Sequence, residues 1–153
     1  MKGSKVAIAV IVYLLLTDGA STVFAKPLKK GKLTSKFGPR IHPITKKASN
    51  HNGIDIGSPN GTPIHSVLAG KVARVGFDDI SGNHAVIESG AYRIGYAHMQ
   101  ELPSVKLGDL VEQDQQIGLV GSTGRSTGNH LHLTVKKNGV AVDPLLEFPG
   151  ILP

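Results

Sequence analysis

Turn-forming residues divide most of this chain into segments that are too short for ordinary helices. The turn signals are Asn60-Gly61, Ser81-Gly82-Asn83, Ser89-Gly90, Gly108-Asp109 and Asn138-Gly139. Between them, runs rich in β-forming residues occur at 64–67, 71–75, 84–88, 92–98, 117–120 and 130–136. No long stretch has apolar residues at the 3.6-residue period of an amphipathic helix. The pattern predicts an all-β protein, with antiparallel strands in a sandwich or a barrel-like sheet.

The length of 153 residues predicts one domain with a substantial core. Residues 26–50 have the character of an extended entry segment that contains a loop. From Asp143-Pro144 onward, we expect a tail that packs down through Leu145, Leu146 and Phe148. No repeat, linker or second domain is evident in the sequence.

The first 25 residues have the features of a secretory signal peptide. A basic start, with Lys2 and Lys5, precedes the unbroken apolar run 6–16, and Val23-Phe24-Ala25 places small residues at positions −3 and −1 of a cleavage site. A membrane anchor is the alternative, but these 11 apolar residues fall short of the ~20 that span a bilayer. We therefore predict export to the periplasm or cell envelope, cleavage after Ala25, and no stable membrane span afterwards.

The formal net charge is +6, and lysines are concentrated in residues 26–34, just after the predicted cleavage site. A basic segment raises the possibility of nucleic acid binding. The export signal and the absence of aromatic residues among these lysines argue against that interpretation. We expect a solvated basic segment, suited to an anionic cell envelope.

Four residues have the chemistry and spacing of a metal site. His130 and His132 are two residues apart in a predicted strand, so their side chains project from one face. His51 and Asp55 form a His-x-x-x-Asp pair earlier in the chain. Because the chain has no cysteine, any zinc site must use His, Asp and Glu. Three ligands with one spare histidine is the composition of an open, catalytic site.

Six motifs in a fixed order extend this pattern over most of the chain. They are SKFGPRIHP at 35–43, HNGIDI at 51–56, NGTPI at 60–64, GYAHM at 95–99, VKLGDLV at 105–111 and QIGLVGSTGRSTGNHLH at 116–132. In these motifs the chain resembles the M23 (lysostaphin or LytM-type) zinc metalloendopeptidases, which cut peptide bonds in bacterial peptidoglycan. The resemblance implies a LytM-type fold (duplicated hybrid motif) over residues 35–153, with long loops around a zinc cleft.

The resemblance also assigns roles to individual residues. It implies that His51, Asp55 and His132 bind one Zn²⁺ per chain, and that His98 and His130 are a catalytic pair flanking the metal-bound water. Elementary chemistry agrees: two imidazoles and one carboxylate leave a fourth zinc position for water, which attacks the amide carbonyl. Histidine is a suitable proton donor and acceptor near neutral pH.

Three further residues are candidates for contact with the substrate. Arg40 and Arg125 have the chemistry to bind a peptide carboxylate, although a solvated arginine is about as common. His42 lies in a loop that the family places near its cleft. We expect His65 and His84 to be structural or simply exposed.

Two other functions remain as alternatives. The first is a non-catalytic peptidoglycan-binding or hydrolase-activating LytM-type module, which the complete set of five site residues disfavours. The second is a cupin-like metal protein, which requires another histidine downstream of His132, and none exists. We expect peptidoglycan peptide stems as the substrate. A single exported domain fits a periplasmic enzyme, or one delivered by a larger envelope or secretion apparatus.

Overall fold

A computed structural model describes residues 23–153 of the chain. Only the last three residues of the predicted signal peptide therefore belong to the described part. The strands are β1 (Lys32–Ser35), β2 (Gly38–Ile41), β3 (Ala48–His51), β4 (Gly53–Gly57), β5 (Pro63–His65), β6 (Gly70–Asp78), β7 (Gly82–Ser89), β8 (Tyr92–Met99), β9 (Leu110–Val111), β10 (Gln116–Leu119), β11 (His130–Lys137) and β12 (Val140–Val142). A single helical turn, α2 (Pro144–Glu147), follows β12.

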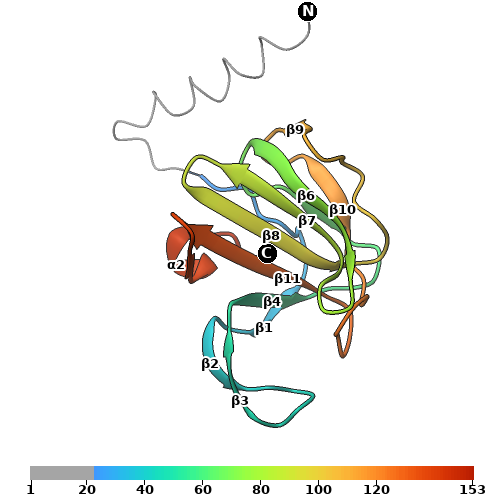
Figure 1. Cartoon of the computed structure of the whole chain (residues 1–153), viewed down its shortest axis with the longest axis vertical. Coiled ribbons are helices and arrows are strands. Elements are labelled where there is room, and N and C mark those ends of the chain that lie inside the picture. Colours follow the sequence, from blue (N-terminus) through green and yellow to red (C-terminus); the bar gives the residue numbers. More distant parts are fainter. Residues whose placement is uncertain (1–22) are drawn as a thin grey trace, which may run out of the picture.

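One large antiparallel sheet forms the body of the domain (Figure 1). Its strands lie in the order β1-β4-β11-β8-β7-β6-β9, and β12 pairs with β11. Two smaller sheets, β5–β10 and β2–β3, complete the fold. The hairpin of β2 and β3 extends away from the body of the domain (Figure 1). The predicted all-β, antiparallel fold is confirmed.

The core lies against one face of the large sheet. Along β4 and β11, the buried residues Ile54, Ile56, Leu131 and Leu133 alternate with Asp55 and His132, as the two-residue period of a strand requires. Ile64 of β5 and Ile117 of β10 belong to the same apolar cluster, so the small β5–β10 sheet covers this face. The opposite face is left free for polar side chains.

The entry segment is more regular than the sequence predicted. Residues 26–50 contain β1 and β2 and nearly all of β3, and β4 follows directly at Gly53. These strands have four or five residues, and β2 contains a proline, so their local signal is weak. Pairing with distant partners, such as β4 with β11, defines them instead. The alternation of Ile54, Asp55 and Ile56 was the available sign of β4.

The basic segment 26–34 packs on the domain, which differs from the solvated tail that its charge predicted. Leu28 is fully buried in the core, and the carbonyl of Pro27 accepts a hydrogen bond from the backbone N–H of His65 (2.8 Å). Lys29 forms an ion pair with Asp114. The apolar pair Pro27-Leu28 therefore anchors a segment whose lysines remain at the surface.

The C-terminal residues also pack on the domain. Asp143 caps α2 by accepting a hydrogen bond from the backbone N–H of Leu145 (2.9 Å), and Phe148 is fully buried. Leu145 packs against the core as expected, but Leu146 is 80% exposed, so that part of the prediction was wrong. A single turn cannot direct two consecutive side chains inward. Within residues 23–153, no helix combines the length and hydropathy needed to cross a membrane.

Candidate metal centre and active site

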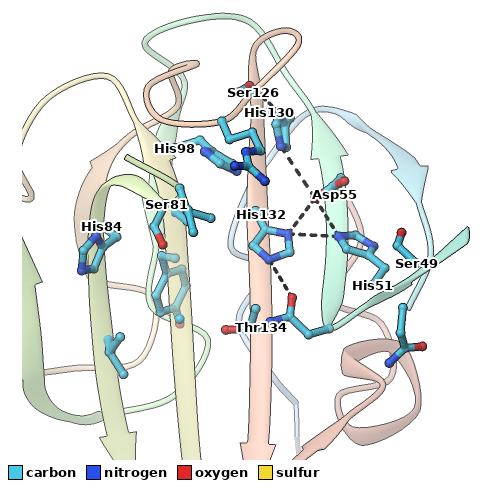
Figure 2. A pocket seen from close by; sticks show the side chains of 18 of the residues that line it. Ser49, His51, Asp55, Ser81, His84, His98, Ser126, His130, His132 and Thr134 are labelled. Atoms are coloured by element: carbon cyan, nitrogen blue, oxygen red, sulfur yellow. Dashed lines mark hydrogen bonds and ion pairs between the residues drawn. The ribbon is translucent and has the colours of Figure 1, made fainter. Parts of the chain in front are cut away.

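Two neighbouring strands bring Asp55 and His132 face to face. In the β4–β11 ladder these two residues are direct register partners, and both point away from the core. His51, at the end of β3, brings a third side chain over the same point (Figure 2). The Nδ1 atom of His132 lies 2.8 Å from Oδ1 of Asp55 and 3.2 Å from Nε2 of His51, and that Nε2 lies 3.3 Å from the same Oδ1.

These three atoms fit a zinc ion. Ligands bound tetrahedrally at about 2.0–2.1 Å from zinc lie roughly 3.3 Å from one another. The observed separations of 2.8–3.3 Å are close to that value before any adjustment. Two imidazole nitrogens and a carboxylate oxygen are also a donor set typical of catalytic zinc. The predicted ligands His51, Asp55 and His132 therefore form one cluster with the right chemistry.

Outer partners orient each of these side chains. The carbonyl of Lys36 accepts a hydrogen bond from Nδ1 of His51 (2.9 Å), which leaves Nε2 free for a metal. The amide oxygen of Asn52 lies 3.2 Å from Nε2 of His132, which likewise leaves Nδ1 free. Asn52 was not predicted to belong to the site, and its position between His51 and Asp55 was the signal that the sequence offered.

Arg40 contacts the site in a different way from the one expected. Its Nη1 donates to Oδ2 of Asp55 (3.2 Å) and to Oγ of Ser35 (2.7 Å), which itself lies 3.3 Å from Nδ1 of His51. The guanidinium thus binds protein groups around the ligands rather than standing free for a substrate. Burial raises the pKa of Asp55, but the hydrogen bonds with His132 and His51 outweigh burial and hold that pKa well below its usual range.

His98 and His130 lie beside each other at one end of the cluster (Figure 2). Their ring centroids are 4.7 Å apart, and Nε2 of His130 lies 3.7 Å from Oδ1 of Asp55. The backbone carbonyl of Thr123 accepts a hydrogen bond from Nδ1 of His98 (2.7 Å). The backbone carbonyl of Gly128 accepts one from Nδ1 of His130 (2.8 Å). The pKa of His98 is lowered to about 4, mainly by burial and also by the neighbouring His130 and His132, which together outweigh the hydrogen bond to the Thr123 carbonyl. His98 is therefore a neutral imidazole at pH 7.

A cleft of about 770 Å³ surrounds these five residues. His42 and Ile44 of the β2–β3 hairpin line it, as do Ile80 and Arg125. Its floor includes Gly95, where a Cβ atom would lie 2.5 Å from the hydroxyl of Thr134. Side-chain bulk is therefore excluded from this part of the floor.

The remaining candidate residues have different surroundings. Nδ1 of His42 accepts from the backbone N–H groups of Ile44 and Thr45, so its ring supports the hairpin turn while lining the cleft. Arg125 is exposed on the loop between β10 and β11. His65 is not among the residues that line this cleft, as expected, whereas the buried His84 is.

Comparison with known proteins agrees with this geometry. The model of peptidase family M23 matches residues 49–144, a segment that contains all five clustered residues. The chain belongs to peptidase family M23.

Individual M23 proteins extend the comparison. The peptidoglycan DD-endopeptidase ShyB of Vibrio cholerae is 41% identical over 116 residues, which are 74% of this chain and 27% of that protein. A zinc-containing peptidase from Vibrio cholerae, a solved structure, has a TM-score of 0.74 and 39% identity, covering 86% of this chain and 41% of that one. The catalytic domain of lysostaphin from Staphylococcus simulans has a TM-score of 0.69 and 32% identity, covering 77% and 92%. The chain spans about a third or less of the length of the curated relatives it matches.

Proposed function

We propose that this chain is an exported zinc-dependent endopeptidase that hydrolyses peptide crosslinks of bacterial peptidoglycan. The observation that carries the proposal is the convergence of three ligand atoms on one point, with two further imidazoles beside them. The M23 relatives support it, since ShyB is named a peptidoglycan DD-endopeptidase. A non-catalytic module has no need of the two additional histidines.

His51, Asp55 and His132 would hold the metal. When bound, zinc supplies a Lewis acid that polarises the peptide carbonyl and makes water nucleophilic at neutral pH. Arg40, Asn52 and the carbonyl of Lys36 keep the three side chains in their binding orientation.

His98 and His130 would handle the protons. Because Nδ1 of His98 donates to Thr123, its Nε2 carries a lone pair and can accept a proton from the attacking water. The resulting imidazolium is disfavoured by burial, so it readily returns that proton to the departing amine. Nδ1 of His130 likewise donates a hydrogen bond, to the carbonyl of Gly128. With a proton on Nε2, this imidazole can stabilise negative charge on the carbonyl oxygen of the substrate.

Digestion of purified sacculi tests this function. The protein should release new termini that mass spectrometry identifies as cleaved crosslinks, and chelation should abolish this activity reversibly. His132→Ala serves as the ligand-deficient control, and His65→Ala as a histidine substitution outside the cleft. Full hydrolysis by metal-free protein, or none by zinc-loaded protein, would contradict the proposal, and the second outcome would favour a binding module.

We expect a preference among crosslinks. D-Ala–diaminopimelate dimers should be cleaved faster than pentaglycine-bridged material, in line with the DD-endopeptidase name of ShyB. Initial rates on the two purified dimers measure this preference, and the reverse order would disprove it.

Export is the remaining part of the proposal. N-terminal sequencing of protein from the envelope fraction should begin at Lys26, which implies that Ala25 is the last residue of the signal peptide. Recovery of only full-length protein in the inner membrane would show that the segment is an anchor.

A further inference from the structure

His98 interrupts the alternation of β8. Ile94 and Tyr96 belong to the apolar core cluster, whereas Gly95 and Ala97 lie outside that cluster and line the cleft. Strict alternation would send His98 into the core and Met99 out of it. The observed arrangement is the reverse, because Met99 is fully buried and His98 lines the cleft.

A β-bulge accounts for this reversal. His98 has a φ angle of 62°, in the left-handed region that few residues other than glycine adopt. The β7–β8 register shifts between Asn83 and Ala85, opposite this position. A bulge adds one residue to a strand and redirects the side chains that follow. The bulge is thus what places the His98 ring beside His130.

Thr123 contacts the bulge through three hydrogen bonds. Its hydroxyl donates to the carbonyl of Met99 (2.6 Å) and accepts from the backbone N–H of Asn83 (3.0 Å), so it bridges the two strands where Asn83 and Met99 face each other. Its own carbonyl accepts from Nδ1 of His98 (2.7 Å). Thr123 therefore binds the backbone of both strands at the bulge and also the imidazole ring of His98.

The β6–β7 turn supports the bulge from a second side. The carbonyl of Ser81 accepts from the backbone N–H of His98 (2.7 Å), and that of Ile80 accepts from the N–H of Arg125 (2.9 Å). Gly82 touches Thr123 so closely that a Cβ atom there would lie 2.3 Å from the threonine hydroxyl. The β6–β7 turn and the loop between β10 and β11 are thus packed tightly together at Thr123.

We propose that Thr123 is a positioning residue for His98. Its hydroxyl stabilises the bulge, and its carbonyl fixes the tautomer that leaves Nε2 of His98 unprotonated and facing the metal cluster. The role concerns the same site as the endopeptidase activity proposed above and rests on it for its catalytic consequence. It acts through His98, with no contact between Thr123 and the metal ligands required.

Thr123→Val tests the role of the hydroxyl with little change of volume, and Thr123→Ser retains the hydroxyl. Since a misplacement of about 1 Å can cost about 10²-fold in rate, we expect kcat of Thr123→Val to fall roughly 10- to 100-fold. KM and zinc stoichiometry should remain near their wild-type values. Thr123→Ser should keep kcat near the wild-type value. Thr45→Val, on the exposed β2–β3 hairpin turn, is the matched control and should leave kcat unchanged.

A second readout is independent of activity. Imidazole ¹⁵N–¹H spectra, assigned with His98→Gln, should show His98 protonated on Nδ1 in the wild type. Thr123→Val should speed exchange of that proton with water at least about tenfold, because local opening becomes easier. If Thr123→Val does not fold, Thr123→Ala removes the same hydroxyl without adding bulk.

Two results would overturn the proposal: wild-type kcat and proton exchange in the hydroxyl-free variants, or a wild-type His98 protonated on Nε2. If the wild-type protein hydrolyses no peptide, the endopeptidase function fails, whereas the tautomer and exchange measurements still decide the role of Thr123.

Discussion

The two halves of the proposed site, one for the metal and one for proton transfer, are built in different ways. Asp55 and His132, in the metal half, are direct partners in a regular antiparallel ladder. In the proton-transfer half, His98 lies on a β-bulge and His130 at the point where a long loop enters β11. Regular strand pairing fixes the distance between Asp55 and His132 at a value that suits two ligands of one metal ion. The bulge brings His98 to the same point from a direction that a regular strand cannot offer, whereas His130 shares the strand face of His132 at the first position of β11.

The largest expected difference between the halves is in the neighbouring histidines of β11. His132→Ala should lose both zinc and hydrolysis, because it removes one of three ligands. His130→Ala should retain zinc and lose about 10²–10⁴-fold in rate, the usual effect of removing an acid–base group. Zinc stoichiometry measured beside turnover checks this. Loss of the metal from His130→Ala and its retention in His132→Ala would reverse the assignment of the two halves.

A smaller effect should follow from changing Arg40, which supports only the metal half. Arg40→Lys keeps the charge but replaces the rigid guanidinium, whose Nη1 contacts both Asp55 and Ser35, with an ammonium group on a flexible stem. Loss of an outer partner typically weakens metal affinity about 10- to 100-fold. Competition with a chelator of known zinc affinity measures this change, with Arg74→Lys as the control at a surface pair with Asp78. Equal zinc affinity in Arg40→Lys and the wild type would refute a supporting role.

The smallest effect concerns His98 and acid stability. Burial lowers its pKa from 6.5 to about 4, so the unfolded chain takes up this proton before the folded protein does. The stabilising contribution of neutral His98 is present above about pH 6.5 and is lost as the pH falls through about 4. In metal-free protein, the free energy of unfolding should therefore decrease over this window, and His98→Gln should weaken that decrease. Denaturant titrations at several pH values measure it, and an unchanged pH dependence would argue against a neutral, buried His98.

The sequence predicted the metal half more completely than the proton-transfer half. The spacing of His130 and His132 and the His-x-x-x-Asp pair follow directly from strand geometry, and the resemblance to M23 peptidases supplied His98. The bulge that turns His98 toward the cleft could not be predicted, because strict alternation places that residue in the core. Likewise, contacts of Arg40, Asn52 and Thr123 join residues far apart in the sequence or depend on backbone angles that composition does not reveal.

The fold was predictable to a similar degree. Strands with a clear apolar pattern, such as β7, β8 and β11, were identified from the sequence alone. The short strands β1 to β3 were missed, because their residues have weak local preference and gain order only by pairing. Leu28 was missed for a related reason: its burial depends on a pocket made by distant strands.

The proposed ligands come from parts of the chain that are far apart, since His51 and His132 are separated by 81 positions in the sequence. A metal held by both therefore ties the start of the domain to one of its last strands, and the unfolded chain has no such preformed site. Any ligand that binds only the native state adds RT ln(1 + [L]/Kd) to its stability, about 2.7 kcal/mol when the free metal is at 100 times Kd. Metal supply would thus govern how long the protein resists proteolysis, as well as whether it is active.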